Sequence, residues 1–253
     1  MKPEIGIIGF GNFGQFLAKR LQRNFRVTVT DQRDLQDLAT TMNVRWGNEA
    51  EVFSKKLIIL AVPLLPLAAV IKQMGKHVGV DSVVVDVCSV KVRPIELMRA
   101  RLPNVKHLGI HPLFGPQSAK KSWRNHKLVV CTNVPSSAKV LMEFFENQGL
   151  VAIKMSAEDH DRDMAVVQSL THFIARALSE MGGVKKSTVA TSAFMQLCKM
   201  LELLTLDSWE LFETLQTGNT FAAPVRASFM RKLREIEDKI RPTLISDSGR
   251  GIY

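Results

Sequence analysis

A serine, a lysine and a histidine lie where polar side chains could do chemistry. Ser89 and Lys91 come directly after the apolar run VVVDV (83–87), and His111 follows the short apolar run 105–110. Ligands of open α/β sheets bind at the carboxyl ends of the strands, so these side chains are expected at a ligand-binding edge. A histidine there can take a proton near neutral pH; a structural histidine bonded to a loop carbonyl is the alternative.

Near the N-terminus, Gly9, Gly11 and Gly14 form a GxGxxG pattern between a predicted strand and a predicted helix. This context predicts a dinucleotide site, whereas a plain turn is the alternative. The first glycine allows the tight turn, the second lets the backbone approach a pyrophosphate, and the third lets the helix pack on the strand. The helix N-terminus then offers free N–H groups to the phosphates.

Asp31 closes the second predicted strand. A carboxylate there would accept hydrogen bonds from the adenosine ribose and repel a 2′-phosphate, which favours NAD. Arg33 would instead reach such a phosphate, so NADP remains possible. The expected cofactor-binding residues are Gly9, Phe10, Gly11, Asn12, Phe13, Gly14, Asp31, Gln32, Arg33, Ala61, Val62 and Pro63.

The elements that must position these residues alternate between two periodicities. Apolar, β-branched runs predict strands at 4–8, 25–30, 56–62, 83–87, 105–110 and 128–131, with helices at 15–23 and 35–42 between them. Strands alternating with helices indicate βαβ units. Residues 1–155 are therefore predicted to be an α/β domain with a Rossmann-type, doubly wound parallel sheet.

Strand-like runs disappear after that point, and residues 156–253 are predicted to form an all-helical domain. Ser156 is expected to cap a long helix over 157–181, which Gly182 and Gly183 would end. His160 and His172 lie on this helix twelve residues apart, so they share a face only roughly.

A further helix is expected from Pro224 to about residue 240, with Pro242 stopping it and a polar, loose tail over 246–253. The helical part is rich in apolar residues for its size, so it needs a partner surface. A second subunit is the favoured partner, which predicts a homodimer; a self-contained bundle is the alternative.

Composition narrows the function classes. The 253 residues are 46% hydrophobic and 23% charged, as in ordinary soluble proteins. Three cysteines without metal-binding spacing indicate reduced thiols in a cytoplasmic protein and no metal site. The net charge of +10 fits attraction of small acidic substrates or a solvated basic surface. Nucleic-acid binding is not expected, because the basic residues are scattered and not interleaved with aromatics.

No targeting or membrane segment is expected either. The first residues lack the apolar region of a secretory signal. The longest apolar run, 57–71, contains two prolines and is shorter than the ~20 residues of a membrane helix.

Four stretches together resemble one family. GFGNFG, DVCSVK, GIHPLFGP and SAEDHDRDMAVVQSLTHFIARAL occur in this order and are similar to the prephenate and arogenate dehydrogenases of tyrosine biosynthesis, from about residue 4 to about residue 215. The resemblance implies a Rossmann domain followed by a helical dimerisation domain. It also implies oxidative decarboxylation of prephenate or arogenate, with hydride transfer to NAD or NADP.

The resemblance also implies roles for individual residues. His111 would accept a hydrogen bond from the substrate hydroxyl, for which it must be neutral. Ser89 would hydrogen-bond near this histidine and the nicotinamide, and His172 would close over the substrate from the helical domain. Lys91 would add positive potential or be a solvated loop lysine, and Gly115 would border the substrate.

One departure from the family pattern leaves the substrate open. The family usually holds the substrate's side-chain carboxylate with an arginine from a later helix, a bidentate task that suits a guanidinium. Here Thr220 and Ala223 lie near the expected position, and Arg226 is the nearest arginine but is displaced. The stretch GPQSAKKSW is somewhat like the arogenate-specific plant enzymes, so an arogenate-specific dehydrogenase is one alternative.

Two other function classes compete with this interpretation. Another Rossmann-plus-helical, NAD(P)-dependent hydroxyacid dehydrogenase would carry a lysine in a glycine-rich helical motif, and the stretch 182–186 lacks the surrounding pattern. A binding protein that keeps the fold without the chemistry would not need Ser89, His111 and His172 together.

Overall fold

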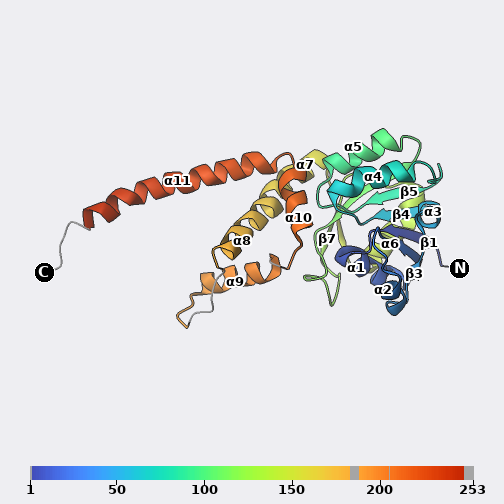
Figure 1. Ribbon diagram of the computed structural model, residues 1–253, viewed down its shortest axis with the longest axis horizontal. Coiled ribbons are helices and arrows are strands. Elements are labelled where there is room, and N and C mark those ends of the chain that lie inside the picture. The colour runs from blue at the N-terminus through green and yellow to red at the C-terminus, as the bar shows by residue number, and fades with distance from the viewer. Residues whose placement is uncertain (1, 183–187, 205, 248–253) are drawn as a thin grey trace.

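The first half of the chain is built on a sheet with the strand order β3-β2-β1-β4-β5-β6-β7-β8 (Figure 1). The computed structural model describes residues 2–182, 188–204 and 206–247. The strands are β1 (Glu4–Ile8), β2 (Arg26–Thr30), β3 (Arg45–Trp46), β4 (Leu57–Leu60), β5 (Val83–Asp86), β6 (Lys106–Pro112), β7 (Lys127–Val130) and β8 (Val151–Lys154). This is the predicted α/β fold, with strand positions close to those expected from periodicity.

The pair β6–β7 departs from the predicted parallel sheet. Within the described chain it is antiparallel, with His111 opposite Val129, whereas the other neighbouring strands run parallel. The segment that joins β6 to β7 contains no helix. A parallel return needs a crossover connection, usually helical, and an antiparallel one does not, which explains the reversal.

Helices cover both faces of the sheet and explain why its central strands are apolar throughout. These helices are α1 (Asn12–Leu21), α2 (Gln36–Thr41), α3 (Glu49–Phe53), α4 (Leu64–Met74), α5 (Val92–Arg101), the short 3-10 turn η1 (Ser136–Ala138) and α6 (Lys139–Asn147). In β4, Leu57 and Ile59 belong to the core on the α1/α6 face, while Ile58 and Leu60 belong to the core on the α4/α5 face. Burial on two sides removes the alternation that a half-exposed strand would show.

The glycine turn after β1 has the geometry expected of its residues. Gly9 has φ +93°, and a Cβ there would lie 2.5 Å from the Ala61 carbonyl oxygen. A Cβ on Gly14 would lie 2.0 Å from the Gly9 carbonyl oxygen. Over Gly11 the space is open, since the nearest atom to a Cβ there, Arg33 Nη2, is 3.9 Å away. Two glycines thus permit the close packing, and the third leaves room for a ligand.

The second half is helical. One continuous helix comprises α7 (Ala157–Met164), the π-helix η2 (Ala165–Leu170) and α8 (Thr171–Glu180), followed by α9 (Ser192–Leu204), α10 (Trp209–Glu213), the π-helix η3 (Thr214–Gly218) and α11 (Ala222–Asp247). Ser156 caps α7 as predicted, because its Oγ accepts a hydrogen bond from the Asp159 N–H. Gly183, part of the predicted helix end, lies outside the described residues.

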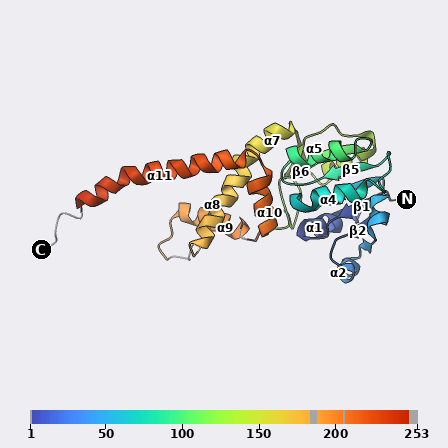
Figure 2. The ribbon, with the colours of Figure 1, turned by 45° about the horizontal axis from the view of Figure 1, so that its top comes forward.

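Helix α11 reaches far beyond the rest of the molecule (Figures 1 and 2). The prediction that Pro242 ends this helix is wrong, since α11 continues to Asp247. A proline removes one backbone hydrogen bond, and a helix that is already propagating can continue past it. The tail expected to be loose lies outside the described residues from 248 on.

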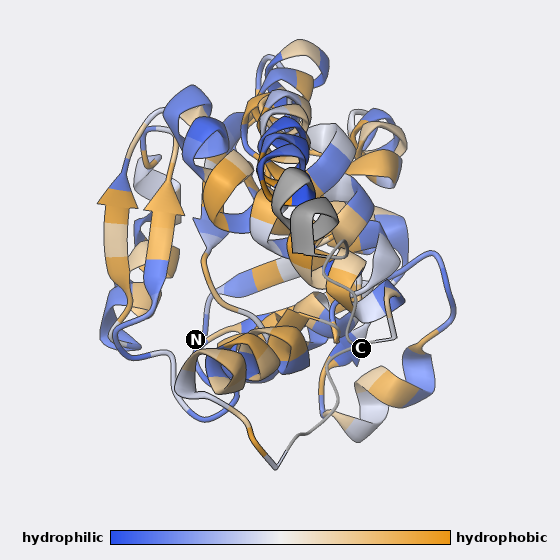
Figure 3. Ribbon diagram, turned by 90° about the vertical axis from the view of Figure 1, so that its left-hand side faces the viewer, coloured by the Kyte–Doolittle hydropathy of each residue, from blue (hydrophilic) through white to orange (hydrophobic). Residues whose placement is uncertain are grey.

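Figure 3, viewed from the α11 end, shows hydrophobic segments in the strands and in the helices beside them, while α11 itself carries both kinds of residue. Among the described residues, no helix combines the length and apolarity that a membrane crossing requires. Cys88, Cys131 and Cys198 are free thiols, in agreement with the reduced state predicted for them.

Candidate active site

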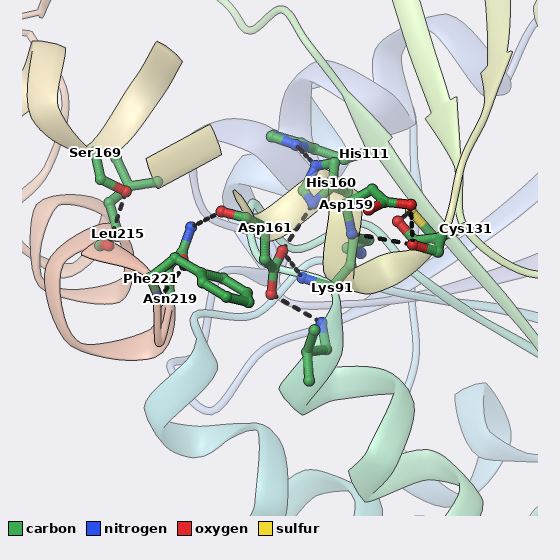
Figure 4. A network of polar contacts seen from close by, with 12 residues as sticks. Lys91, His111, Cys131, Asp159, His160, Asp161, Ser169, Leu215, Asn219 and Phe221 are labelled. Carbon is green, nitrogen blue, oxygen red and sulfur yellow. Dashed lines mark hydrogen bonds and ion pairs between the residues drawn. The ribbon is translucent and has the colours of Figure 1, made fainter. Parts of the chain in front are cut away.

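The carboxyl ends of β5 and β6 meet the helical half of the chain at one junction (Figure 4). From the helical side, Gly218 at the end of η3 packs closely against the α/β half: a Cβ on it would lie 2.4 Å from Leu64 Cδ2 and 3.6 Å from Val90 Cγ2. The loop that carries Ser89 and Lys91 is therefore covered by the second half, which places the predicted strand-end residues between the two domains.

A row of three buried side chains crosses this junction. His111 Nδ1 lies 2.8 Å from His160 Nε2, and His160 Nδ1 lies 2.7 Å from Asp161 Oδ1. His111 comes from the end of β6, whereas His160 and Asp161 come from α7 (Figure 4). None of the three is more than 5% exposed. Their contacts therefore persist without competition from water.

Asp161 also binds the start of helix α5. Its Oδ1 accepts a hydrogen bond from the Lys91 N–H at 2.7 Å, and its Oδ2 accepts one from the Val92 N–H at 3.0 Å. Its backbone carbonyl accepts a hydrogen bond from Asn219 Nδ2 at 2.6 Å. The carboxylate satisfies N–H groups that have no partner inside the helix and faces the positive end of the helix dipole.

His111 is held neutral by its surroundings. Burial lowers the pKa of His111 well below its usual value, and the nearby His160 and Lys91 lower it further. A neutral imidazole has one ring nitrogen that donates and one that accepts a hydrogen bond. The histidine is thus suited to accept a hydrogen bond from a hydroxyl, as the resemblance implies.

Ser89 and Lys91, the other predicted strand-end residues, are both buried but differ in their hydrogen bonds. Ser89 Oγ is buried and has no hydrogen-bond partner among the described residues. The Lys91 ammonium is fully buried and donates to Asp86 Oδ2, to the Asp86 carbonyl at 3.4 Å and to the Ile110 carbonyl at 2.8 Å. The interpretation of Lys91 as a solvated loop lysine is wrong, because this internal ion pair keeps it inside.

Lys91 therefore contributes to the site through internal hydrogen bonds and not through a free ammonium group. Its three donors already have three acceptors, so direct contact with a substrate would require breaking one of these bonds. Burial raises the pKa of Asp86, and the Lys91 charge opposes that rise.

His172 lies in a pocket of the helical half, apart from the three-residue row. The pocket is lined by His172, Ala175, Arg176, Ser179, Leu204, Asp207, Ser208 and Phe212. His172 Nε2 lies 3.8 Å from Asp207 Oδ2. Burial, assisted by the Arg176 charge, lowers the pKa of His172 to about 4, while burial raises the pKa of Asp207. Near pH 7 the imidazole is neutral and does not neutralise Asp207.

The π-helix η2 brings His160 and His172 onto one face of their helix. In a regular α-helix, a separation of twelve residues leaves two side chains about 120° apart around the axis. The six residues of η2 advance by only about 80° each, which reduces the offset to nearly zero. Both histidines are in fact buried, with exposures of 0% and 7%. Residue spacing alone predicts that the two histidines share a face only roughly. The π-helix, which spacing does not reveal, brings them onto the same face.

Among the described residues, Arg226 and Gly115 take no part in the three-residue row or in the His172 pocket. Arg226 Nη1 donates to the Gln216 carbonyl at 2.9 Å and to Gln216 Oε1 at 2.8 Å, so its guanidinium holds the η3 turn. It is not among the residues that line the His172 pocket. A Cβ on Gly115 would meet nothing within 4 Å, so that loop has free space beside it.

The glycine turn fits a dinucleotide. Gly11 is the N-cap of α1 and brings no side-chain cap, so the first N–H groups of this helix remain available to phosphates. Asp31 accepts hydrogen bonds from the Phe10 N–H at 2.7 Å and from Arg33 Nε at 3.0 Å. Ala61 packs on the turn, and Pro63 begins α4 at the adjacent strand end.

Four functional candidates were missed from the sequence: His160, Asp161, Arg176 and Asp207. The first pair lies in the block EDHD, where two buried polar residues interrupt the solvated start of a helix. Residue spacing in that block gives no signal for a site; only its resemblance to the family does. No group of three or more metal-ligating side chains occurs in the part of the chain that the structure describes.

Two family models match parts of the chain, and the first covers more than half of it. The family model described as "Prephenate dehydrogenase, nucleotide-binding domain" matches residues 15–154. A second model, "TYRAAT1-like, C-terminal domain", matches residues 177–249. The first match ends at residue 154 and the second begins at residue 177.

Individual proteins with similar sequences are also named as dehydrogenases. "Arogenate dehydrogenase 2, chloroplastic" of Arabidopsis thaliana is 32% identical over 83% of this chain and 62% of its own length. A "Probable arogenate/prephenate dehydrogenase" of Methanocaldococcus jannaschii is 26% identical over 94% of this chain and 56% of its own. The chain thus spans about three fifths of the length of these relatives.

A crystal structure of the prephenate dehydrogenase of A. aeolicus, in complex with hydroxyphenyl propionate and NAD+, superposes with a TM-score of 0.75. It is 18% identical and covers 98% of this chain and 93% of that one. At this identity the likeness establishes the fold, a Rossmann-type domain with helices after it.

His172 should make stability depend on pH. Its pKa is about 4 in the folded protein and about 6.5 in an unfolded chain, so between these values the unfolded state binds the extra proton. Stability therefore rises with pH across that window and falls on acidification. Between pH 7 and pH 5, urea unfolding should show a loss about 2 kcal/mol larger for the wild type than for His172→Gln. His77→Gln, at an exposed position, is the control; equal losses in His172→Gln and wild type would contradict this assignment.

Proposed function

Because the chain belongs to the prephenate dehydrogenase family, we propose that it catalyses the oxidative decarboxylation of a prephenate-type cyclohexadienol. The observation that carries the proposal is His111: a buried, neutral imidazole at a strand end, with Nδ1 engaged and no protein partner on Nε2 among the described residues. This is the acceptor that a reacting hydroxyl needs. The likeness to dehydrogenases in both halves supports the same reaction.

In this proposal, His111 Nε2 accepts the proton of the substrate hydroxyl as the ring carbon becomes a carbonyl carbon. Bound NAD would accept the hydride from that carbon. The ring carboxylate then leaves as carbon dioxide, and the ring becomes aromatic. Ser89 Oγ is buried and has no partner in the described part of the chain, so it would hydrogen-bond the substrate hydroxyl or the nicotinamide amide. The buried ion pair between Lys91 and Asp86 holds the strand-end loop in place.

The His172 pocket favours an amino acid as the other end of the substrate. Asp207 is a half-buried carboxylate whose nearest cationic candidate, His172, is neutral near pH 7. Arg176 lies over the Trp209 and Phe212 rings, at 5.3 and 5.2 Å, and has no hydrogen bond to another described residue. One free carboxylate and one free guanidinium match the ammonium and the carboxylate of an amino acid. We therefore propose arogenate as the preferred substrate.

Arg176 then takes the task that the family pattern gives to an arginine of a later helix. Arg226 is the nearest arginine in that later helix, but its guanidinium is committed to Gln216. Arg176 lies one helical turn after His172 on α8 and lines the same pocket. Contact with two aromatic rings restricts the movement of the guanidinium, which favours bidentate binding.

For the cofactor we propose NAD rather than NADP. Asp31 lies at the end of β2, where its carboxylate is placed to accept hydrogen bonds from ribose hydroxyls. Its charge opposes a 2′-phosphate. Arg33 is the competing feature, but its guanidinium is bonded to Asp31 rather than free. The Asp31 and Glu210 charges both raise the pKa of Arg33.

We propose further that the protein is a homodimer formed through the helical half. Only the first part of α11 packs on η2 and η3, and the rest projects outward (Figures 1 and 2). Met230, Leu233, Ile236 and Ile240 form an exposed apolar stripe along one side of α11. An apolar stripe that stays exposed among the described residues is the surface that a second copy would bury.

Turnover is tested with purified protein, with NAD and NADP each offered with arogenate and with prephenate, while the reduced cofactor is followed by absorbance. We expect turnover with arogenate and NAD. His111→Asn should lower kcat roughly 10²–10⁴-fold, because the proton acceptor is lost, with an unchanged Kd for NAD. His77→Asn is the exposed control. No turnover in any combination overturns the proposed function, and an active His111→Asn overturns the role of His111.

Substrate choice is tested with Asp207→Asn, which removes the charge and keeps the shape. Loss of a charged hydrogen bond of about 1.5–3 kcal/mol should lower kcat/KM for arogenate about 10- to 100-fold and leave prephenate less affected. Glu202→Gln on exposed α9 is the control. An unchanged ratio between the two substrates would show that Asp207 does not bind the ammonium group.

The dimer is tested by light scattering coupled to size-exclusion chromatography. We expect twice the chain mass of 28.3 kDa for the wild type. Ile236→Asp should shift the population toward the monomer, because it places a charge in the apolar stripe. Val80→Asp, at an exposed apolar position of the α/β half, should not. A monomeric wild type would rule the proposal out.

A further inference from the structure

The hydrogen bonds in the row Asp161–His160–His111 run in one donor-to-acceptor direction. That direction determines whether His111 Nε2 can accept a proton. Each neutral histidine carries one N–H, so each contact in the row needs one donor and one acceptor. The contacts are short, 2.7 and 2.8 Å, and both histidines are buried, so neither contact can be exchanged for water. Assigning one proton in the row therefore assigns the others.

The start of helix α5 fixes the end of the row. Asp161 Oδ1 and Oδ2 each accept a backbone N–H, from Lys91 and from Val92. Both oxygens are therefore acceptors, and the remaining contact, with His160 Nδ1, is one in which the histidine donates. The negative charge is balanced by the helix N-terminus, so the row does not need a second proton on His160.

We infer that His160 and Asp161 are positioning residues that hold His111 as the Nδ1–H tautomer. With its proton on Nδ1, His160 presents the lone pair of Nε2 to His111. His111 must then donate from Nδ1, and its Nε2 keeps the lone pair. That nitrogen has no protein partner among the described residues, and His111 retains 5% exposure. The catalytic meaning of this lone pair rests on the proposed function, but the tautomer itself does not.

The opposite arrangement places two acceptors together. If His111 carried its proton on Nε2, neutral His160 would have to donate from its own Nε2 and turn a lone pair toward Asp161 Oδ1 at 2.7 Å. A doubly protonated His160 would avoid that clash, but it would bury a further cation beside the Lys91 ammonium. Either alternative leaves His111 unable to accept a proton at Nε2.

The experiment that tests this is nitrogen-15 NMR of histidine-labelled protein, which distinguishes the two tautomers by two-bond correlations between ring protons and ring nitrogens. His111 is assigned by the signal that His111→Asn removes. We expect the Nδ1–H form in wild type at neutral pH. His160→Gln should keep it, because the amide can donate to Asp161 and accept from His111. His160→Leu, which removes the acceptor, should convert His111 wholly or partly to the Nε2–H form.

Turnover provides the second readout. His160→Gln should stay at least about tenfold more active than His160→Leu, with equal KM for the cofactor; a wrong tautomer can lower turnover by up to about 10⁴-fold. An Nε2–H form in wild type overturns the inference, as does an unchanged tautomer in His160→Leu. If His160→Leu fails to fold, the wild-type and His160→Gln spectra still decide. An Nδ1–H form without any turnover would refute the proposed function and leave the tautomer assignment standing.

Discussion

The carboxylate of Asp161 accepts hydrogen bonds from both halves of the protein, and the geometry of the site depends on it. It binds the first N–H groups of α5 on the α/β side and the ring of His160 on its own side. A charged group that leaves water must find partners for its lone pairs, and these donors supply them. The same residue thereby joins the domains, caps a helix and orients a histidine.

The Asp86–Lys91 ion pair shows how the strand-end loop keeps its shape next to this carboxylate. A buried ion pair adds little net stability but is costly to break, because the remaining charge would be left without a partner. Lys91 is tied through its side chain to Asp86 and through its backbone N–H to Asp161. Ser89 lies between Asp86 and Lys91 in the sequence, so its loop is held although its hydroxyl has no hydrogen bond to any described residue.

Much of the fold could be predicted from the sequence because its signals are local. A strand that is buried on both faces, such as β4, is recognised in the sequence as a continuous apolar run. The close packing at Gly9 and Gly14 requires glycine, which is equally visible in the sequence. The reversed direction of β7 could not be predicted, since strand polarity leaves no mark on periodicity. The helix past Pro242 was missed because local propensity overstates the effect of one proline in a long helix.

The site was predicted less completely, for a related reason. His111 and Ser89 could be found because strand ends gather at one edge of the sheet. The role of His160 depends on a neighbour 49 positions away, and periodicity gives the face of a helix but not what that face meets. The burial of Lys91 was equally hidden, because its partner Asp86 ends an otherwise apolar strand.

The π-helix η2 has one more consequence. It sets the angular phase between the end of the long helix that holds His160 and Asp161 and the end that lines the His172 pocket. If the same six residues of η2 were wound as an ordinary α-helix, the distal pocket would turn around the axis by about 120° relative to α7. Substitutions on α8 and α10, by contrast, leave that phase intact. The pocket end can thus vary in evolution residue by residue, whereas the winding of the helix between the two ends cannot.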